Sequence, residues 1–139
     1  MAMTALETVI AIHSADDIVA ARQAGRELAA KLEFSLTDVT MITTAISEVA
    51  RNISTYAGHG EIRLGVTQRH GRQALTVQAV DAGPGIADVE RALEDGFSTS
   101  SGLGLGLPGA RRLMDDFELE SQVGVGTTVT MWKWLPPGA

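Results

Sequence analysis

Residues 36–60 read LTDVTMITTAISEVARNISTYAGHG and have, up to Tyr56, the pattern of one amphipathic helix. Apolar side chains recur at steps of three and four residues, which is the spacing of a single helical face. Glu48 and Asn52 are four residues apart and fall on a different face. The apolar stripe consists of Val39, Ile42, Ile46, Val49 and Ile53, and the polar face of Thr44, Glu48, Asn52 and Thr55. The sequence therefore predicts a helix that packs on the core with one face and leaves another free for a ligand.

The segments on either side of this helix predict a sheet and further helices. Alternation and turn chemistry indicate strands at 6–12, 61–67, 74–80, 118–123 and 127–134. Ser14 and Asp17 form a capping pattern that opens an earlier helix, a short helix is expected at 89–93, and another runs from Gly106 to about Phe117. This order predicts a two-layer α/β sandwich with a mixed, mostly antiparallel sheet packed on helices. With no linker or repeat in it, the chain is expected to form a single domain over residues 1–139.

The composition excludes several classes of protein. A chain of 139 residues can bury one core but has no room for a separate receptor unit. Its net charge of −6 disfavours a nucleic-acid partner, and the absence of cysteine excludes disulfides and thiolate metal sites. No segment has the pattern of a signal peptide or a membrane span. A cytoplasmic protein with no membrane or nucleic-acid partner is therefore expected.

Two polar residues of the long helix have a chemistry suited to phosphoryl transfer. A carboxylate such as that of Glu48 can take the proton of an attacking hydroxyl, and an amide oxygen such as that of Asn52 can help to hold Mg²⁺ between phosphates. An isolated E-x-x-x-N pattern, however, is more often a solvated polar face. Glu48 and Asn52 therefore indicate a phosphoryl-transfer site only in combination with other motifs of the chain.

Two glycine-rich segments follow the predicted strands. Asp81 ends one strand, and Gly83 and Gly85 after it would let a ring approach the backbone while the carboxylate accepts from an exocyclic amino group. Gly102, Gly104 and Gly106 precede a helix and would direct backbone N–H groups at phosphates, with 95–101 as a flexible lid. Each segment alone also fits an ordinary turn or surface loop. No strand precedes the second segment, which excludes a Rossmann fingerprint, and the chain has no P-loop or eukaryotic-type kinase motif.

The three motifs together resemble the GHKL (Bergerat-fold) ATP-binding domains. Glu48-Val-Ala-Arg-Asn52 corresponds to the N box, Asp81-Ala-Gly-Pro-Gly85 to the G1 box and Gly102-Leu-Gly-Leu-Gly106 to the G2 box. Gly126-Thr-Thr128 is similar to the final G-T element of that family. The resemblance implies the Bergerat fold, ATP as the ligand and Mg²⁺ as the accompanying ion.

Within that family the chain is most similar to the switch serine/threonine kinases of the bacterial stressosome. The resemblance implies phosphorylation of STAS-domain antagonist and scaffold proteins, followed by activation of a PP2C-type phosphatase or another effector. It leaves open whether the chain forms a homodimer. The matching strings cover nearly the whole chain and are Asp17-Ile-Val-Ala-Ala-Arg-Gln23, Thr43-Thr-Ala-Ile-Ser-Glu48, Ala50-Arg-Asn-Ile53, Asp95-Gly-Phe-Ser-Thr-Ser100, Leu107-Pro-Gly109 and Arg112-Leu-Met-Asp115.

The resemblance also assigns a role to each candidate site residue. Glu48 is implied as the general base, Asn52 as the Mg²⁺ ligand, Asp81 as the acceptor of the adenine amino group and Thr127 as a neighbour of adenine. Arg22 is implied as a partner-binding residue, although a solvated helix charge explains it almost as well. The implied glycine contacts are Gly83 and Gly85 at the base and Gly102, Gly104 and Gly106 at the phosphates.

Three other functions compete with the switch kinase. An anti-sigma factor of the same fold would bind ATP but mainly hold an RNA polymerase sigma subunit, and the strings around Phe97 and Arg112 argue against it. The ATP-binding half of a histidine kinase would need a phosphoacceptor helical hairpin, which no segment supplies. A nucleotide-binding scaffold without catalysis stays open, since positioning decides whether phosphoryl transfer occurs.

Overall fold

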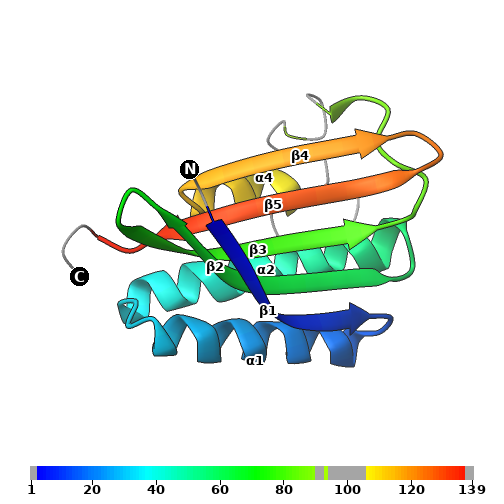
Figure 1. The fold of residues 1–139 in the computed structure, drawn as a ribbon. Coiled ribbons are helices and arrows are strands. Elements are labelled where there is room, and N and C mark those ends of the chain that lie inside the picture. Colours follow the sequence, from blue (N-terminus) through cyan, green and yellow to red (C-terminus); the bar gives the residue numbers. More distant parts are fainter. Residues whose placement is uncertain (1–2, 90–92, 94–105, 137–139) are drawn as a thin grey trace.

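A computed structural model describes residues 3–89, 93 and 106–136 of the chain. Five strands form one layer, and the helices α1 (Ala15–Lys31), α2 (Leu36–Tyr56) and α4 (Gly106–Leu113) cover one face of it (Figure 1). The predicted two-layer α/β sandwich is confirmed. The short helix expected at 89–93 and the lid expected at 95–101 lie largely or wholly outside the described residues.

The sheet has the strand order β1-β2-β3-β5-β4, and each of these neighbouring pairs is antiparallel. Hairpins account for two of the four pairs, β2–β3 and β4–β5, because consecutive strands joined by short turns pair side by side. The strands are β1 (Met3–Ile12), β2 (Gly60–Arg69), β3 (Arg72–Asp81), β4 (Asp116–Gln122) and β5 (Gly126–Trp134). The strand β1 thus starts three residues before the predicted position.

Register decides which side chains the sheet turns towards the helices. Asp81 on β3 pairs with Thr127 on β5, and Val77 pairs with Met131. Directly paired residues share a face, so these four side chains project towards the helix layer. Because Asp81 is the last residue of β3, this face ends in a polar carboxylate beside the C-terminal end of α2.

The helix α2 is the centre of the core. It contacts α1 on one side and α4 on the other, and it lies across the middle strands (Figure 1). Ile42, Ile46 and Ile53 of its predicted stripe are at most 1% exposed, as the periodicity requires. The Ser35 hydroxyl accepts a hydrogen bond from the Asp38 N–H at 3.1 Å and caps the helix at its N-terminus.

The predicted C-terminal limit of the last helix is wrong. The helix α4 ends at Leu113, whereas the sequence placed its end near Phe117. The Asp115 N–H donates to the Trp132 carbonyl at 3.0 Å, and Phe117 already pairs with Met131 in β4. Pairing with β5 therefore overrides a helical pattern that local spacing alone would extend.

Candidate nucleotide site

Glu48 lies on α2 at the start of α4. It is only 7% exposed, and its carboxylate accepts a 2.9 Å hydrogen bond from the Gly106 N–H through Oε2. Its other oxygen, Oε1, accepts from the Arg51 guanidinium at 3.1 Å. A carboxylate at a helix N-terminus meets an unpaired backbone donor and the positive end of the helix dipole. The structure thus brings together two of the predicted site residues that are far apart in sequence, Glu48 and Gly106.

Arg51 is a contact of the site for which the sequence analysis assigned no role. It is the fourth residue of the predicted N box, and its spacing of three from Glu48 places the two side chains on one helix face. This spacing is the feature of the sequence from which the contact between Arg51 and Glu48 could have been predicted. The positive charge of Arg51 compensates the negative charge of the largely buried Glu48 carboxylate.

Asn52 follows Glu48 by one turn on α2 and is half-buried. No other residue in the described part of the chain hydrogen-bonds to its side-chain amide. One carbonyl oxygen, together with phosphate oxygens and waters, fits the way Mg²⁺ is usually held in nucleotide sites. The described residues contain no cluster of three or more acidic or histidine side chains that would suggest a metal centre built by protein alone.

Asp81 forms the second end of the site. It is the last residue of β3 and precedes residues 82–85, which we call the glycine turn. Its Oδ1 atom accepts a 2.9 Å hydrogen bond from the Gly83 N–H. A side chain at Gly83 would place a Cβ atom 2.6 Å from the Ala57 Cβ, so this turn packs directly on the C-cap of α2. The distance along α2 from Glu48 to Ala57 is about 13 Å at 1.5 Å per residue. This length suits an extended nucleoside triphosphate lying along the helix.

Two glycines have backbone conformations that a side chain would not tolerate. Gly85 has φ of 78°, and a Cβ there would lie 2.4 Å from the Gln122 carbonyl oxygen. Gly126 has φ of 147°, and its Cβ would lie 2.1 Å from the Asp81 carbonyl oxygen. Both contacts are with backbone, which cannot move aside as a flexible side chain can. The backbones of the glycine turn and of the β4–β5 hairpin are therefore in close contact beside Asp81.

Thr127 is 6% exposed and shares a 2.9 Å hydrogen bond with the Ser121 hydroxyl. Ser121 also accepts from the Ile86 N–H at 2.7 Å and contacts the Gly126 carbonyl at 3.1 Å. Ser121 thus ties the end of the glycine turn to β5. Sequence reasoning missed it, because a serine in an alternating strand has no signal of its own.

The predicted site residues fall into three groups. Asp81, Gly83, Gly85 and Thr127 meet at one end of α2, where the glycine turn packs on Ala57 and Asp81 pairs with Thr127. Glu48 and Gly106 meet further along α2 with Asn52 between the two ends. Arg22 is separate, exposed on α1, and Gly102 and Gly104 lie outside the described residues.

The site combines a buried carboxylate, that of Glu48, at the N-terminus of α4 with a second carboxylate, that of Asp81, beside a glycine turn. This is the arrangement expected of the ATP-binding domains that the sequence motifs resemble. Residues 13–133 match the model of the family described as "Histidine kinase-like ATPase domain", and the chain belongs to this family. Within it the chain groups with the serine/threonine-protein kinases related to RsbT. It is 51% identical to "Serine/threonine-protein kinase RsbT" of Bacillus subtilis (strain 168) over 129 residues, which is 93% of this chain and 97% of that protein.

A further sequence relative and two solved structures are similar to the chain at lower identity. An "Anti-sigma F factor" of Caldanaerobacter subterraneus subsp. tengcongensis is 32% identical over 120 residues, 83% of each chain. The solved structure of the RsbU and RsbW domains of a Mycobacterium tuberculosis protein superposes with a TM-score of 0.62 at 17% identity, covering 94% of this chain and 34% of that one. The SiaB–SiaC complex of Pseudomonas aeruginosa gives 0.56 at 12% identity, covering 94% and 91%. The two solved structures support the fold alone.

Proposed function

We propose that this chain is the kinase of a bacterial partner switch, which transfers the γ-phosphoryl group of ATP to a serine or threonine of a STAS-domain antagonist or scaffold protein. The observation that carries the proposal is the 2.9 Å hydrogen bond between Glu48 and the Gly106 N–H, which brings a candidate base to a candidate phosphate-binding helix end. The relationship to RsbT supports the same reading.

The adenine of ATP is proposed to bind at the end of the sheet beside Asp81. The Oδ2 atom of Asp81 is not used by the Gly83 N–H and is available to accept from an exocyclic amino group. Gly83 and Gly85 keep the approach free of side chains, and Thr127 forms the neighbouring wall. The phosphates then extend along α2 towards Gly106, and the glycines at 102 and 104 are proposed to complete their binding.

Mg²⁺ is proposed to bind through the Asn52 amide oxygen together with phosphate oxygens. Bound there, the ion would neutralise charge on the phosphates during transfer. Asn52 itself orients the triphosphate along the polar face of α2, because it lies between the adenine end and Glu48.

Glu48 is proposed to accept the proton of the attacking hydroxyl. Each of its oxygens has one hydrogen bond in the structure and a second lone pair for a further donor. Arg51 and the Gly106 N–H fix the orientation of the carboxylate, so little rearrangement is needed when the hydroxyl arrives. The site is thus suited to holding the reacting groups in place, which is the main contribution of a protein to phosphoryl transfer.

An anti-sigma factor kinase that sequesters an RNA polymerase sigma subunit is the second candidate. The 32% identity to an anti-sigma F factor favours it, and the 51% identity to RsbT over nearly both full chains favours the switch kinase more. The two functions share the nucleotide site and differ in the protein that is held. Binding measurements with a sigma subunit and with a STAS-domain protein side by side distinguish them.

The wild-type chain is expected to transfer labelled phosphate from ATP to a STAS-domain protein encoded in the same genome, in the presence of Mg²⁺. Phosphopeptide mass spectrometry of the product should place the phosphate on a serine or threonine. Tight ATP binding without transfer to any STAS-domain protein would contradict the kinase and favour the non-catalytic scaffold.

Arg22→Ala is expected to weaken binding of the STAS-domain partner by at least about tenfold, the effect of losing an arginine hot spot. Arg22 is exposed on α1, away from the nucleotide contacts, so ATP affinity should stay unchanged. Lys31→Ala is the matched control, because it removes a positive charge from the same helix about half a turn round from Arg22. Equal partner affinities of the two variants, measured by calorimetry, would contradict the docking role.

We propose that residues 1–139 form one kinase domain that acts in the cytoplasm, with which the absence of cysteine is compatible. No helix in the described residues is long and apolar enough to cross a membrane. A PP2C-type phosphatase is the proposed downstream effector.

A further inference from the structure

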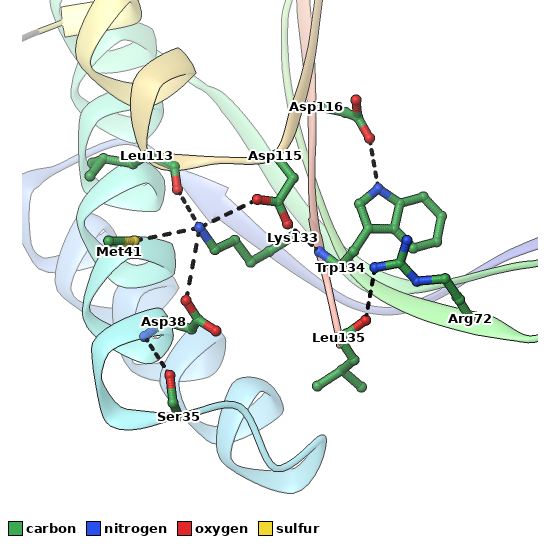
Figure 2. A network of polar contacts seen from close by, with 10 residues as sticks. All are labelled: Ser35, Asp38, Met41, Arg72, Leu113, Asp115, Asp116, Lys133, Trp134 and Leu135. Atoms are coloured by element: carbon green, nitrogen blue, oxygen red, sulfur yellow. Dashed lines mark hydrogen bonds and ion pairs between the residues drawn. The ribbon is translucent and has the colours of Figure 1, made fainter. Parts of the chain in front are cut away.

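Lys133 on β5 is a buried cation at the junction of α2, α4 and β4 (Figure 2). It is 7% exposed, and its Nζ donates to the Leu113 carbonyl at 2.8 Å. The same atom lies 3.7 Å from Asp115 Oδ1, 4.0 Å from Asp38 Oδ1 and 3.5 Å from the Met41 sulfur. A buried ammonium is tolerated only where such partners surround it. The contacts therefore specify how these elements meet.

The strand register explains why a lysine reaches this place. Lys133 shares the helix-facing side of β5 with Thr127, Val129 and Met131, since alternate residues project to one face. Thr127 lies at the nucleotide end of this row, and Lys133 lies about 20 Å away at the other end. The lysine is thus remote from adenine and beside the C-terminal end of α4.

The helix α4 is held on α2 at both of its ends. Its first residue, Gly106, donates its N–H to Glu48, and the carbonyl of its last residue, Leu113, accepts from Lys133 beside Asp38. Asp38 and Glu48 are ten residues apart, about 15 Å along α2, and the eight residues of α4 span about 12 Å. The two helices therefore run antiparallel, with a carboxylate at the positive end of α4 and an ammonium at its negative end.

We propose that Lys133 is a positioning residue for phosphoryl transfer, which anchors the C-terminal end of α4 on α2 and so sets the place of the Gly106 N–H against Glu48. This inference rests on the proposed function. A short helix with few turns moves as a rigid unit, so loosening one end displaces the other. Displacement of a reacting group by about 1 Å can cost about a hundredfold in rate.

The test compares Lys133→Met with wild type. Methionine keeps the unbranched shape and removes the charge, and Asp38 and Asp115, with side chains 29% and 42% exposed, can still be hydrated. We expect faster hydrogen exchange of the Gly106 amide by NMR and a kcat about 10- to 100-fold lower. The affinity for ADP, which depends mainly on the contacts around Asp81, should change by less than about threefold.

Two further variants separate positioning from a general loss of stability. Ile12→Val removes a buried methyl group from β1, at the opposite edge of the sheet from β4, and should lower the melting temperature without changing kcat or the exchange of Gly106. Lys133→Arg keeps the charge and should restore most of kcat and of the Gly106 protection. If Lys133→Met does not fold, Asp38→Asn, which removes one facing carboxylate, should give a smaller change of the same kind.

Unchanged Gly106 exchange and unchanged kcat in Lys133→Met would overturn the inference. A loss of kcat no larger than that of Ile12→Val at equal folded fraction would overturn it too. If the wild type transfers no phosphate, the proposed function fails instead, and the Gly106 exchange alone then decides whether Lys133 anchors α4.

Discussion

Glu48→Gln is expected to lower kcat for transfer to the STAS-domain partner by about 10²- to 10⁴-fold, the usual contribution of a general base. Glutamine keeps the size and can still accept from the Gly106 N–H, so α4 should stay in place. It loses the negative charge that takes the proton and that pairs with Arg51. ATP affinity should therefore remain nearly unchanged while turnover falls, which calorimetry and single-turnover kinetics can separate.

Asn52→Ala is the contrasting variant, one helical turn along α2. Removing a metal ligand should weaken Mg²⁺-dependent ATP binding as well as turnover, whereas binding in the absence of Mg²⁺ should change little. The two variants should thus fail in different ways. A decrease of less than about tenfold in kcat for Glu48→Gln would contradict the base assignment and leave Glu48 as the residue that caps α4.

Asp81→Asn is expected to raise the Kd for ATP and ADP by about 10- to 100-fold, since a hydrogen bond to a charged group contributes about 1.5–3 kcal/mol. The oxygen that accepts from the Gly83 N–H can remain, so the glycine turn should keep its shape. The other oxygen becomes an amide NH₂, which faces the donor of the adenine amino group with a second donor. Isothermal titration with ADP measures the loss.

Asp16→Asn is the matched control for Asp81→Asn, because it makes the same chemical change on the exposed first turn of α1. Its ADP affinity should equal that of the wild type. Inosine diphosphate has a carbonyl oxygen in place of the adenine amino group, so it should bind Asp81→Asn, whose amide NH₂ can donate to that oxygen, more tightly than it binds the wild type. Equal ADP affinities of Asp81→Asn and Asp16→Asn would contradict the adenine contact.

Periodicity predicted the elements of the fold well where one face of an element is buried. The stripe of α2 and the alternation in β3 and β5 are consequences of burial that can be read in single segments. The end of α4 was not predictable in this way. Residues 114–117 can continue a helix locally, and only the pairing of Phe117 with Met131 makes the extended conformation more favourable.

The residues of the candidate site likewise fall into those that the sequence predicted and those that only the structure revealed. Motif spacing singled out Glu48, Asn52, Asp81 and the glycines, because each belongs to a short contiguous pattern with a chemical meaning. Ser121 and Lys133 have no such pattern, and their contacts with Ile86 and Leu113 span 35 and 20 residues. Contacts of this kind depend on the register of β4 and β5 against the rest of the sheet.

The sequence by itself determined the helix and strand order, the polar face of α2 and the chemistry available on it, since these follow from the local spacing of apolar and polar residues. Only the tertiary structure decided that Glu48 accepts from Gly106, that the glycine turn packs on Ala57 and that Lys133 joins α4 to α2. Side-chain contacts between distant segments depend on how the helices and strands pack together. The distances within the site are therefore properties of the assembled core.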